Sequence, residues 1–83
     1  MDKIVIENLI MRAVFDALTG KNPDHIYSDE MHWEYSVRNK EGQFLVLAKN
    51  GVLVCTLNIR RSMTFDQIFR WVESNIRFFE TND

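Results

Sequence analysis

The amino-acid sequence predicts one α+β domain: a helix, three antiparallel strands and a second helix, with both helices on one face of the sheet. Three observations lead to this fold class. Apolar residues recur at helical spacing near the start of the chain, alternating and turn-bounded segments fill its middle, and a capped amphipathic segment follows. A chain of 83 residues that is 46% hydrophobic and 27% charged makes a single globular domain over residues 1–83.

The first helix is expected over residues 3–19, with Asp2 as its N-cap and Gly20 just after its end. One broad apolar face should pack on the sheet; it contains Ile6, Leu9, Ile10, Ala13, Val14 and Ala17. A second apolar stripe lies well round the helix from this face; it contains Ile4, Met11, Phe15 and Leu18. A surface helix of a small monomer needs only one apolar stripe, so the second stripe is surplus.

Three strands are expected, over residues 32–38, 43–49 and 52–59. The first alternates between apolar and polar residues, which is typical of a strand with one wet face at the edge of a sheet. Residues 25–31 are interpreted mostly as a connection, in which a strand could begin. Residues 39–42 are expected to form one hairpin turn and Asn50-Gly51 a two-residue type I′ turn.

The Asn50-Gly51 turn also predicts how the second and third strands pair. A regular two-residue hairpin places Leu47 opposite Val54 and, on the other face, Val46 opposite Cys55. Both faces of this hairpin are then apolar, and such strands are normally covered on both sides.

The second helix is expected over residues 64–79, because Thr64 and Gln67 have the spacing of a capping box, with Ser62 as a rival cap. Its core stripe should contain Phe65, Ile68, Phe69, Val72, Ile76 and Phe79. Trp71 and Phe78 lie beside that stripe and widen it.

Two short helices can cover only one face of a three-stranded sheet, so apolar surface is left over. Contiguous exposed apolar patches usually mark an interface. We therefore expect a homodimer or a bound protein partner, with interface residues Phe15, Met11, Trp33, Tyr35 and Trp71. The alternative is that the first strand or residues 25–31 fold over the second face, or that the core is simply rich in apolar residues. The register of the first strand leaves open whether Trp33 and Tyr35 face the core or the partner.

Residues that carry chemistry match no catalytic, metal or cofactor motif. Histidines and carboxylates cluster without the spacing of a metal site, and we interpret them as a polar strand face; they are His25, Asp29, Glu30, His32 and Glu34. Cys55 lies among apolar residues, where a thiol is a core residue rather than a nucleophile. We therefore expect no enzyme, no metal and no cofactor.

Charge and cysteine content limit the remaining classes. The net charge is −2 and the pI about 5.6, which disfavours a general nucleic-acid binder. A single cysteine suits a reducing compartment, so a cytoplasmic protein is expected, and no apolar run is long enough for a membrane span.

The stretch Arg60-Arg61-Ser62-Met63-Thr64-Phe65-Asp66 precedes and opens the second helix. The order helix, three antiparallel strands, helix resembles the double-stranded-RNA-binding domain, in which a lysine run at this position lies across phosphates. Here two arginines and then an acid replace that run. The resemblance implies nucleic-acid binding as the alternative function, through Arg38, Lys40, Arg60 and Arg61. The leading expectation is a small non-enzymatic protein-binding or regulatory module of the inhibitor, immunity or adaptor type.

Overall fold

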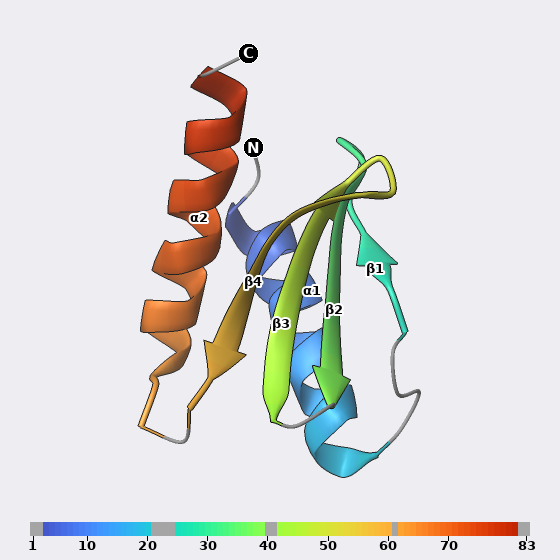
Figure 1. Cartoon of the computed structure of the whole chain (residues 1–83), viewed down its shortest axis with the longest axis vertical. Coiled ribbons are helices and arrows are strands. Elements are labelled where there is room, and N and C mark those ends of the chain that lie inside the picture. The colour runs from blue at the N-terminus through green and yellow to red at the C-terminus, as the bar shows by residue number, and fades with distance from the viewer. Residues whose placement is uncertain (1–2, 21–24, 40–41, 61, 82–83) are drawn as a thin grey trace.

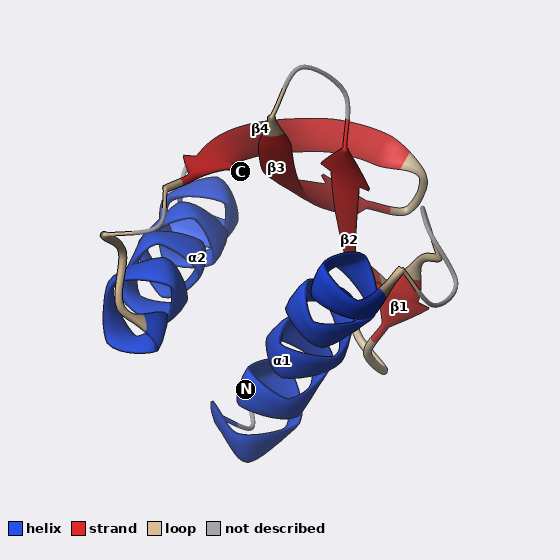
Figure 2. Ribbon diagram, turned by 90° about the horizontal axis from the view of Figure 1, so that it is seen from below, coloured by secondary structure: helices blue, strands red, loops and turns tan. Residues whose placement is uncertain are grey.

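The computed structural model describes residues 3–20, 25–39, 42–60 and 62–81. Its elements are α1 (Lys3–Thr19), β1 (Tyr27–Ser28), β2 (Trp33–Asn39), β3 (Gln43–Lys49), β4 (Val52–Ile59) and α2 (Phe65–Thr81), as Figure 1 shows. The strands form one antiparallel sheet in the order β1-β2-β3-β4. Both helices lie on the same side of this sheet (Figure 2). The predicted α+β fold is confirmed, with a very short fourth strand added. The predicted cap Asp2 lies outside the described residues.

Helix α1 buries the predicted face and ends at the predicted residue. Ile6, Ile10 and Ala13 are buried in the core, and Leu9, Val14 and Ala17 pack against it. Gly20 has φ +71°, the left-handed conformation that glycine adopts freely after a helix end.

Strand β1 lies at the edge of the sheet. The sequence predicts the strand over residues 32–38 at this edge, and that prediction is wrong. Tyr27 pairs with Tyr35 and Ser28 with Glu34, so β2 lies between β1 and β3. The turn before β2 is closed by Asp29, whose carboxylate Oδ1 accepts the N–H groups of Met31 and Trp33 at 2.9 and 3.0 Å. This side-chain turn brings residues 27–28 back along β2, which the apolar pattern alone does not show.

The hairpin of β3 and β4 has the predicted turn but a different register. Asn50 and Gly51 have φ of 51° and 79°, as a type I′ turn requires, and Ala48 pairs with Leu53. A β-bulge then shifts the pairing, so that Leu47 lies opposite Cys55 instead of Val54. The predicted pairing of Val46 with Cys55 is therefore wrong, because β4 has one residue more than β3 at this point.

The bulge changes which side chains of β4 face the helices. Beyond it, Cys55, Leu57 and Ile59 pack against the core. Thr56 and Asn58 take the opposite face. A continuous apolar run therefore does not make both faces of this strand apolar along its whole length.

The core lies between the sheet and the two helices. Trp33 and Tyr35 are both fully buried in it. The ring of Phe79 from α2 meets the Trp33 ring edge-on, with centroids 5.3 Å apart. The other buried apolar residues of this core are Ile6, Ile10, Ala13, Val37, Leu45, Leu47, Ile68, Phe69, Val72 and Ile76.

Helix α2 begins with the predicted capping box. The Thr64 Oγ1 accepts the N–H of Gln67 at 3.2 Å, and the Gln67 Oε1 accepts the N–H of Thr64 at 2.9 Å. Its solvated face carries the ion pairs Asp66–Arg70 and Glu73–Arg77.

Candidate protein-interaction surfaces

The second apolar stripe of α1 is exposed, as the sequence predicts. Met11, Phe15 and Leu18 are 54%, 58% and 67% exposed, and Ile4 is exposed on the same stripe. We call Met11, Phe15 and Leu18 the α1 stripe. A shallow hollow runs along it between Asn8, Met11, Arg12, Phe15 and Asp16.

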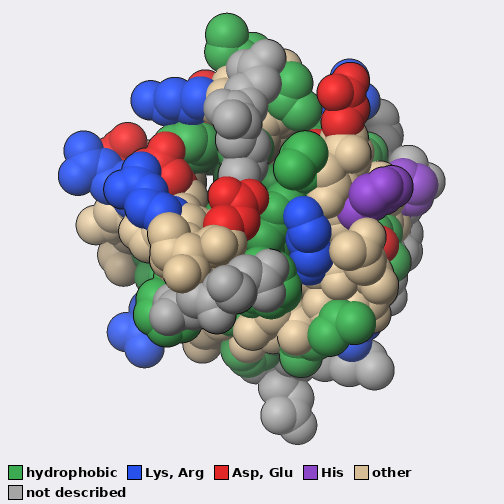
Figure 3. Space-filling model, turned by 90° about the horizontal axis from the view of Figure 1, so that it is seen from above, with side chains coloured by type: hydrophobic (Ala, Val, Ile, Leu, Met, Phe, Trp, Pro, Cys, Tyr) green, Lys and Arg blue, Asp and Glu red, His purple; other side chains and the backbone are tan. Residues whose placement is uncertain are grey.

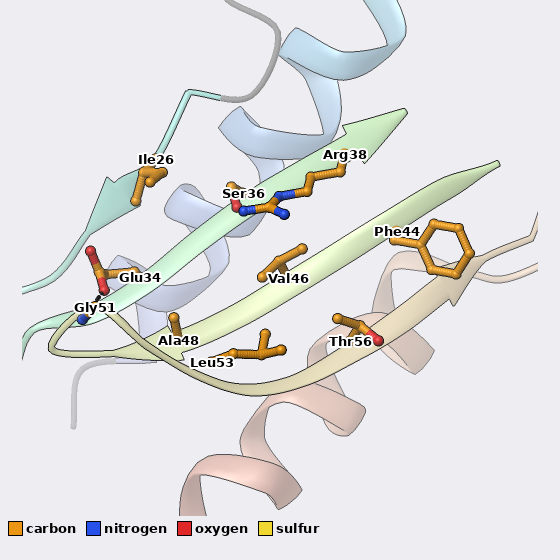
Figure 4. Close-up of a pocket in the computed structure, with 10 residues that line it drawn as sticks. All are labelled: Ile26, Glu34, Ser36, Arg38, Phe44, Val46, Ala48, Gly51, Leu53 and Thr56. Carbon is orange, nitrogen blue, oxygen red and sulfur yellow. Dashed lines mark hydrogen bonds between the residues drawn. The ribbon is translucent and has the colours of Figure 1, made fainter. Parts of the chain in front are cut away.

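A larger hollow lies on the face of the sheet that is turned away from the helices. It encloses about 530 Å³, and Figure 4 shows the residues around it. We call this surface the outer sheet face; it is lined by Ile26, Glu34, Ser36, Arg38, Phe44, Val46, Ala48, Gly51, Leu53 and Thr56.

The β3 side chains on the floor of the outer sheet face are apolar. Phe44, Val46 and Ala48 come from alternate positions of β3, which lies between β2 and β4. Val46 and Ser36 are already buried within the single chain, whereas Leu53 at the margin is 62% exposed. Burial at the centre and exposure at the rim make this a surface that a partner could cover without reshaping it.

Two oppositely charged residues, four positions apart on β2, line this face. Glu34 and Arg38 both belong to β2 and project from it on the outer side (Figure 4). The Glu34 Oε1 accepts the backbone N–H of Gly51 at 2.6 Å, which holds the carboxylate in place. The Arg38 guanidinium has no hydrogen bond or ion pair with the residues that the structure describes.

The aromatic residues predicted for an interface are not all on the surface. Phe15 is exposed on the α1 stripe, but Trp33 and Tyr35 lie in the core and are not accessible to a partner of this folded chain. The first strand's register, which the sequence left open, therefore points both rings inward. Trp71 is half-buried at the core margin, beside a shallow hollow that it shares with Leu57, Arg60, Ser62, Met63 and Gln67.

The cations predicted for nucleic-acid contact are partly described. Arg38 and Arg60 are exposed at the same end of the sheet, where β2 and β4 both end. Lys40 and Arg61 lie outside the described residues. On the face of the molecule shown in Figure 3, basic and acidic side chains are interspersed. That face therefore has no broad field of one sign.

The cysteine, histidines and carboxylates singled out in the sequence have the following surroundings in the described residues. Burial raises the pKa of the Cys55 thiol, which disfavours the reactive thiolate. No group of three His, Cys, Asp or Glu residues in the described ranges is placed to hold a metal ion. From the sequence cluster of histidines and carboxylates, Asp29 serves the turn before β2 and His25 packs edge-on against the Tyr27 ring at 4.5 Å.

The sequence predicts an uncovered apolar face on the hairpin of residues 43–59 but does not show which residues assemble it. It places Ile26 in a connection, and it gives no sign of the bulge that arranges the β4 side chains on this face. The bulge is what joins Val46 to Thr56 across β3 and β4. The visible signal was the alternation of β2, which put Glu34, Ser36 and Arg38 together on one side.

No family model, curated protein sequence or solved structure matches this chain. Neither helix of the described residues has the length and apolar character needed to cross a membrane.

Proposed function

We propose that this chain is a small non-enzymatic protein-binding module that acts as a homodimer. The single observation that carries the protein-binding part of the proposal is the α1 stripe, three large apolar side chains that are more than half exposed on one helix face. The core already uses a different face of the same helix, so the stripe has no role in packing this chain.

The exposed side chains of the α1 stripe would gain free energy if a partner buried them. Burying a large apolar side chain stabilises it by about 1.5–3 kcal/mol relative to leaving it in water. Small domains have a net stability of only about 5–15 kcal/mol, so three such residues represent a large unused stabilisation. Binding another protein would supply it, and exposed apolar patches usually have that role.

The outer sheet face supports the same proposal with a second surface. One surface suits self-association and leaves the other for a different protein, as in an adaptor or an inhibitor. Interfaces of this kind have an apolar centre, and the outer sheet face has Phe44, Val46 and Ala48 on its floor.

Sedimentation equilibrium of the full chain tests the homodimer. A dimer has twice the 9.9 kDa mass of the chain. We expect the weight-average mass to rise toward that value across the micromolar range, and the midpoint of thermal unfolding to rise with concentration. A monomer mass at every concentration, with an unfolding midpoint independent of concentration, would contradict the proposal.

Nucleic-acid binding is the alternative function, because Arg38 and Arg60 are exposed at the same end of the sheet. It predicts a mobility shift with duplex RNA at low salt that weakens steeply as salt rises. The protein-binding proposal predicts no such shift, and a salt-sensitive shift lost in Arg38→Ala/Arg60→Ala would favour the alternative.

A further inference from the structure

We propose that two copies of this chain meet through the outer sheet face, with Arg38 of each copy paired with Glu34 of the other. This inference rests on the proposed homodimer and names the surface that forms it. The α1 stripe would then stay open for a further protein, because α1 lies on the other side of the sheet (Figure 2).

The charges of this face are balanced within one copy. Among its ten lining residues only Glu34 and Arg38 are ionisable at neutral pH. The face therefore has no net charge, although the whole chain has a net charge of −2. Two such faces can approach without the like-charge repulsion that opposes many self-associations.

The positions of the two charged residues on β2 fit a two-fold axis. Glu34 and Arg38 lie four residues apart, so their Cα atoms are about 13 Å apart along the strand, with Ser36 midway. In a dimer whose two outer sheet faces pack together, a two-fold axis can lie between the sheets, perpendicular to the strands, at the level of Ser36. Such an axis makes β2 of the second copy run opposite to β2 of the first. Each Arg38 then lies opposite Glu34 of the other copy, so both ion pairs form at once, as a self-complementary interface requires.

The apolar side chains fit the same axis. Arg38 pairs across the sheet with Phe44, and Glu34 with Ala48. The axis that superposes Arg38 on Glu34 of the other copy therefore also brings the large Phe44 opposite the small Ala48. Val46 sits at the axis, where the small part of it that is exposed faces its own counterpart. Large side chains opposite small ones let two sheets interdigitate.

The two charged groups are both available for this pairing. The Glu34 Oε1 accepts the Gly51 N–H, which leaves its second oxygen for a guanidinium. Arg38 has no partner among the described residues; its side chain runs along the groove toward Ser36 (Figure 4), and the guanidinium would turn from there to reach Glu34 of the other copy. Arginine–carboxylate pairs are the charge-assisted hydrogen bonds with the best defined geometry.

Charge reversal gives a sharp test, in sedimentation experiments on the full chain. Arg38→Glu places two acids opposite each other in each pair, and Glu34→Arg places two arginines there. We expect each variant alone to dimerise about 100-fold more weakly than the natural chain. An equimolar mixture of the two variants should restore the dimer, because every pair in the mixed dimer again joins Arg and Glu. The matched controls are Arg70→Glu and Glu80→Arg, at exposed positions of α2, which change the charge as Arg38→Glu and Glu34→Arg do.

The outcomes separate this inference from the proposed function. Rescue in the mixture, with the two α2 control variants unaffected, supports the sheet-face dimer. If the natural chain dimerises and both single variants dimerise as tightly as the α2 controls, the sheet-face inference is overturned and the homodimer stands. A natural chain that stays monomeric overturns both.

A cross-linking measurement covers the case in which a charge variant fails to fold. Thr56 is exposed and lies in the row Ser36–Val46–Thr56, which the axis follows. In a Cys55→Ser background, Thr56→Cys should be joined into a covalent dimer by a short bismaleimide. Ser74→Cys, exposed on α2, should give no more dimer than random collision. Equal yields from the two positions would contradict the sheet-face dimer.

Discussion

The hydroxyl of Tyr35 donates a hydrogen bond of 3.1 Å to the Oδ2 of Asp29 from within the core. The other oxygen of the same carboxylate accepts the N–H groups of Met31 and Trp33. One acidic side chain therefore ties the turn before β2 to the hydrophobic core. This explains how a strand of only two residues, β1, is held at the edge of the sheet.

Removal of this carboxylate should destabilise the fold. Asp29→Ala leaves the Tyr35 hydroxyl and two backbone N–H groups without their acceptor, and we expect a loss of about 3 kcal/mol in the free energy of unfolding. Urea denaturation measures it. Glu30→Ala, in the same exposed turn, is the control and should change stability by less than about 0.5 kcal/mol. Equal effects of the two substitutions would mean that Asp29 does not organise the turn.

Alkaline pH should weaken the fold through Tyr35. Burial, together with the charge and hydrogen bond of Asp29, raises the pKa of Tyr35 above its ordinary value of 10.0. The folded chain then keeps a proton that the unfolded chain releases. The stabilising contribution is full below pH 10.0 and decreases as pH rises above it.

Denaturation by urea across this pH range, in the natural chain and in Tyr35→Phe, measures the effect. The variant should be less stable at neutral pH by about 1 kcal/mol, and its stability should fall less steeply above the ordinary tyrosine pKa. Tyr27 must be replaced by Phe in both proteins, because its hydrogen bond to Asp16 also raises the pKa of the Tyr27 phenol. Parallel curves for the two proteins would contradict the role of Tyr35.

Local chemistry made most of the fold predictable. The caps and turns at Gly20, Asn50-Gly51 and Thr64 depend on neighbouring residues only, and each lies where the sequence indicates. The bulge was not predictable in the same way, because Val54 is as apolar as its neighbours. Which residues of β4 turn toward the helices depends on how well their side chains pack in the core, and that depends on residues far away in the sequence.

The Asn50-Gly51 turn should tolerate only one of two simple substitutions. A Cβ at Gly51 would meet no atom within 4 Å, but its φ of 79° is unfavourable for alanine. We expect Gly51→Ala to cost about 1–2 kcal/mol. Asn50→Gly, at the neighbouring positive φ, should change stability by less than about 0.5 kcal/mol. Thermal unfolding of both variants tests this, and a neutral Gly51→Ala would contradict it.

The capping box of α2 can be tested against the rival cap. Thr64→Ala removes the acceptor for the Gln67 N–H and should lower the free energy of unfolding by about 1 kcal/mol. Ser62 is exposed and has no side-chain hydrogen bond with the described residues, so Ser62→Ala should have almost no effect. Chemical denaturation distinguishes them, and a larger loss in Ser62→Ala would mean that the helix begins from Ser62.

The candidate surfaces were predictable where helical periodicity governs them. The spacing of Met11, Phe15 and Leu18 places them away from the core face, and they are exposed. Trp33 and Tyr35 could not be assigned, because a strand has two faces and the four-residue turn expected over residues 39–42 leaves both available. Their burial depends on the contact with α2 and the bond to Asp29, which join residues far apart in the sequence.

Truncation on the core face of α1 should lower stability, whereas truncation on the α1 stripe should leave stability almost unchanged. Ile10 is fully buried, so Ile10→Ala should cost about 2–5 kcal/mol in the free energy of unfolding. Phe15 is 58% exposed, and Phe15→Ala should change that free energy by less than about 0.5 kcal/mol. Because the dimer proposed here uses the other side of the sheet, Phe15→Ala should also sediment like the natural chain. A weaker dimer in Phe15→Ala would move the self-association surface to α1, and a large loss of stability would mean that Phe15 packs within the chain.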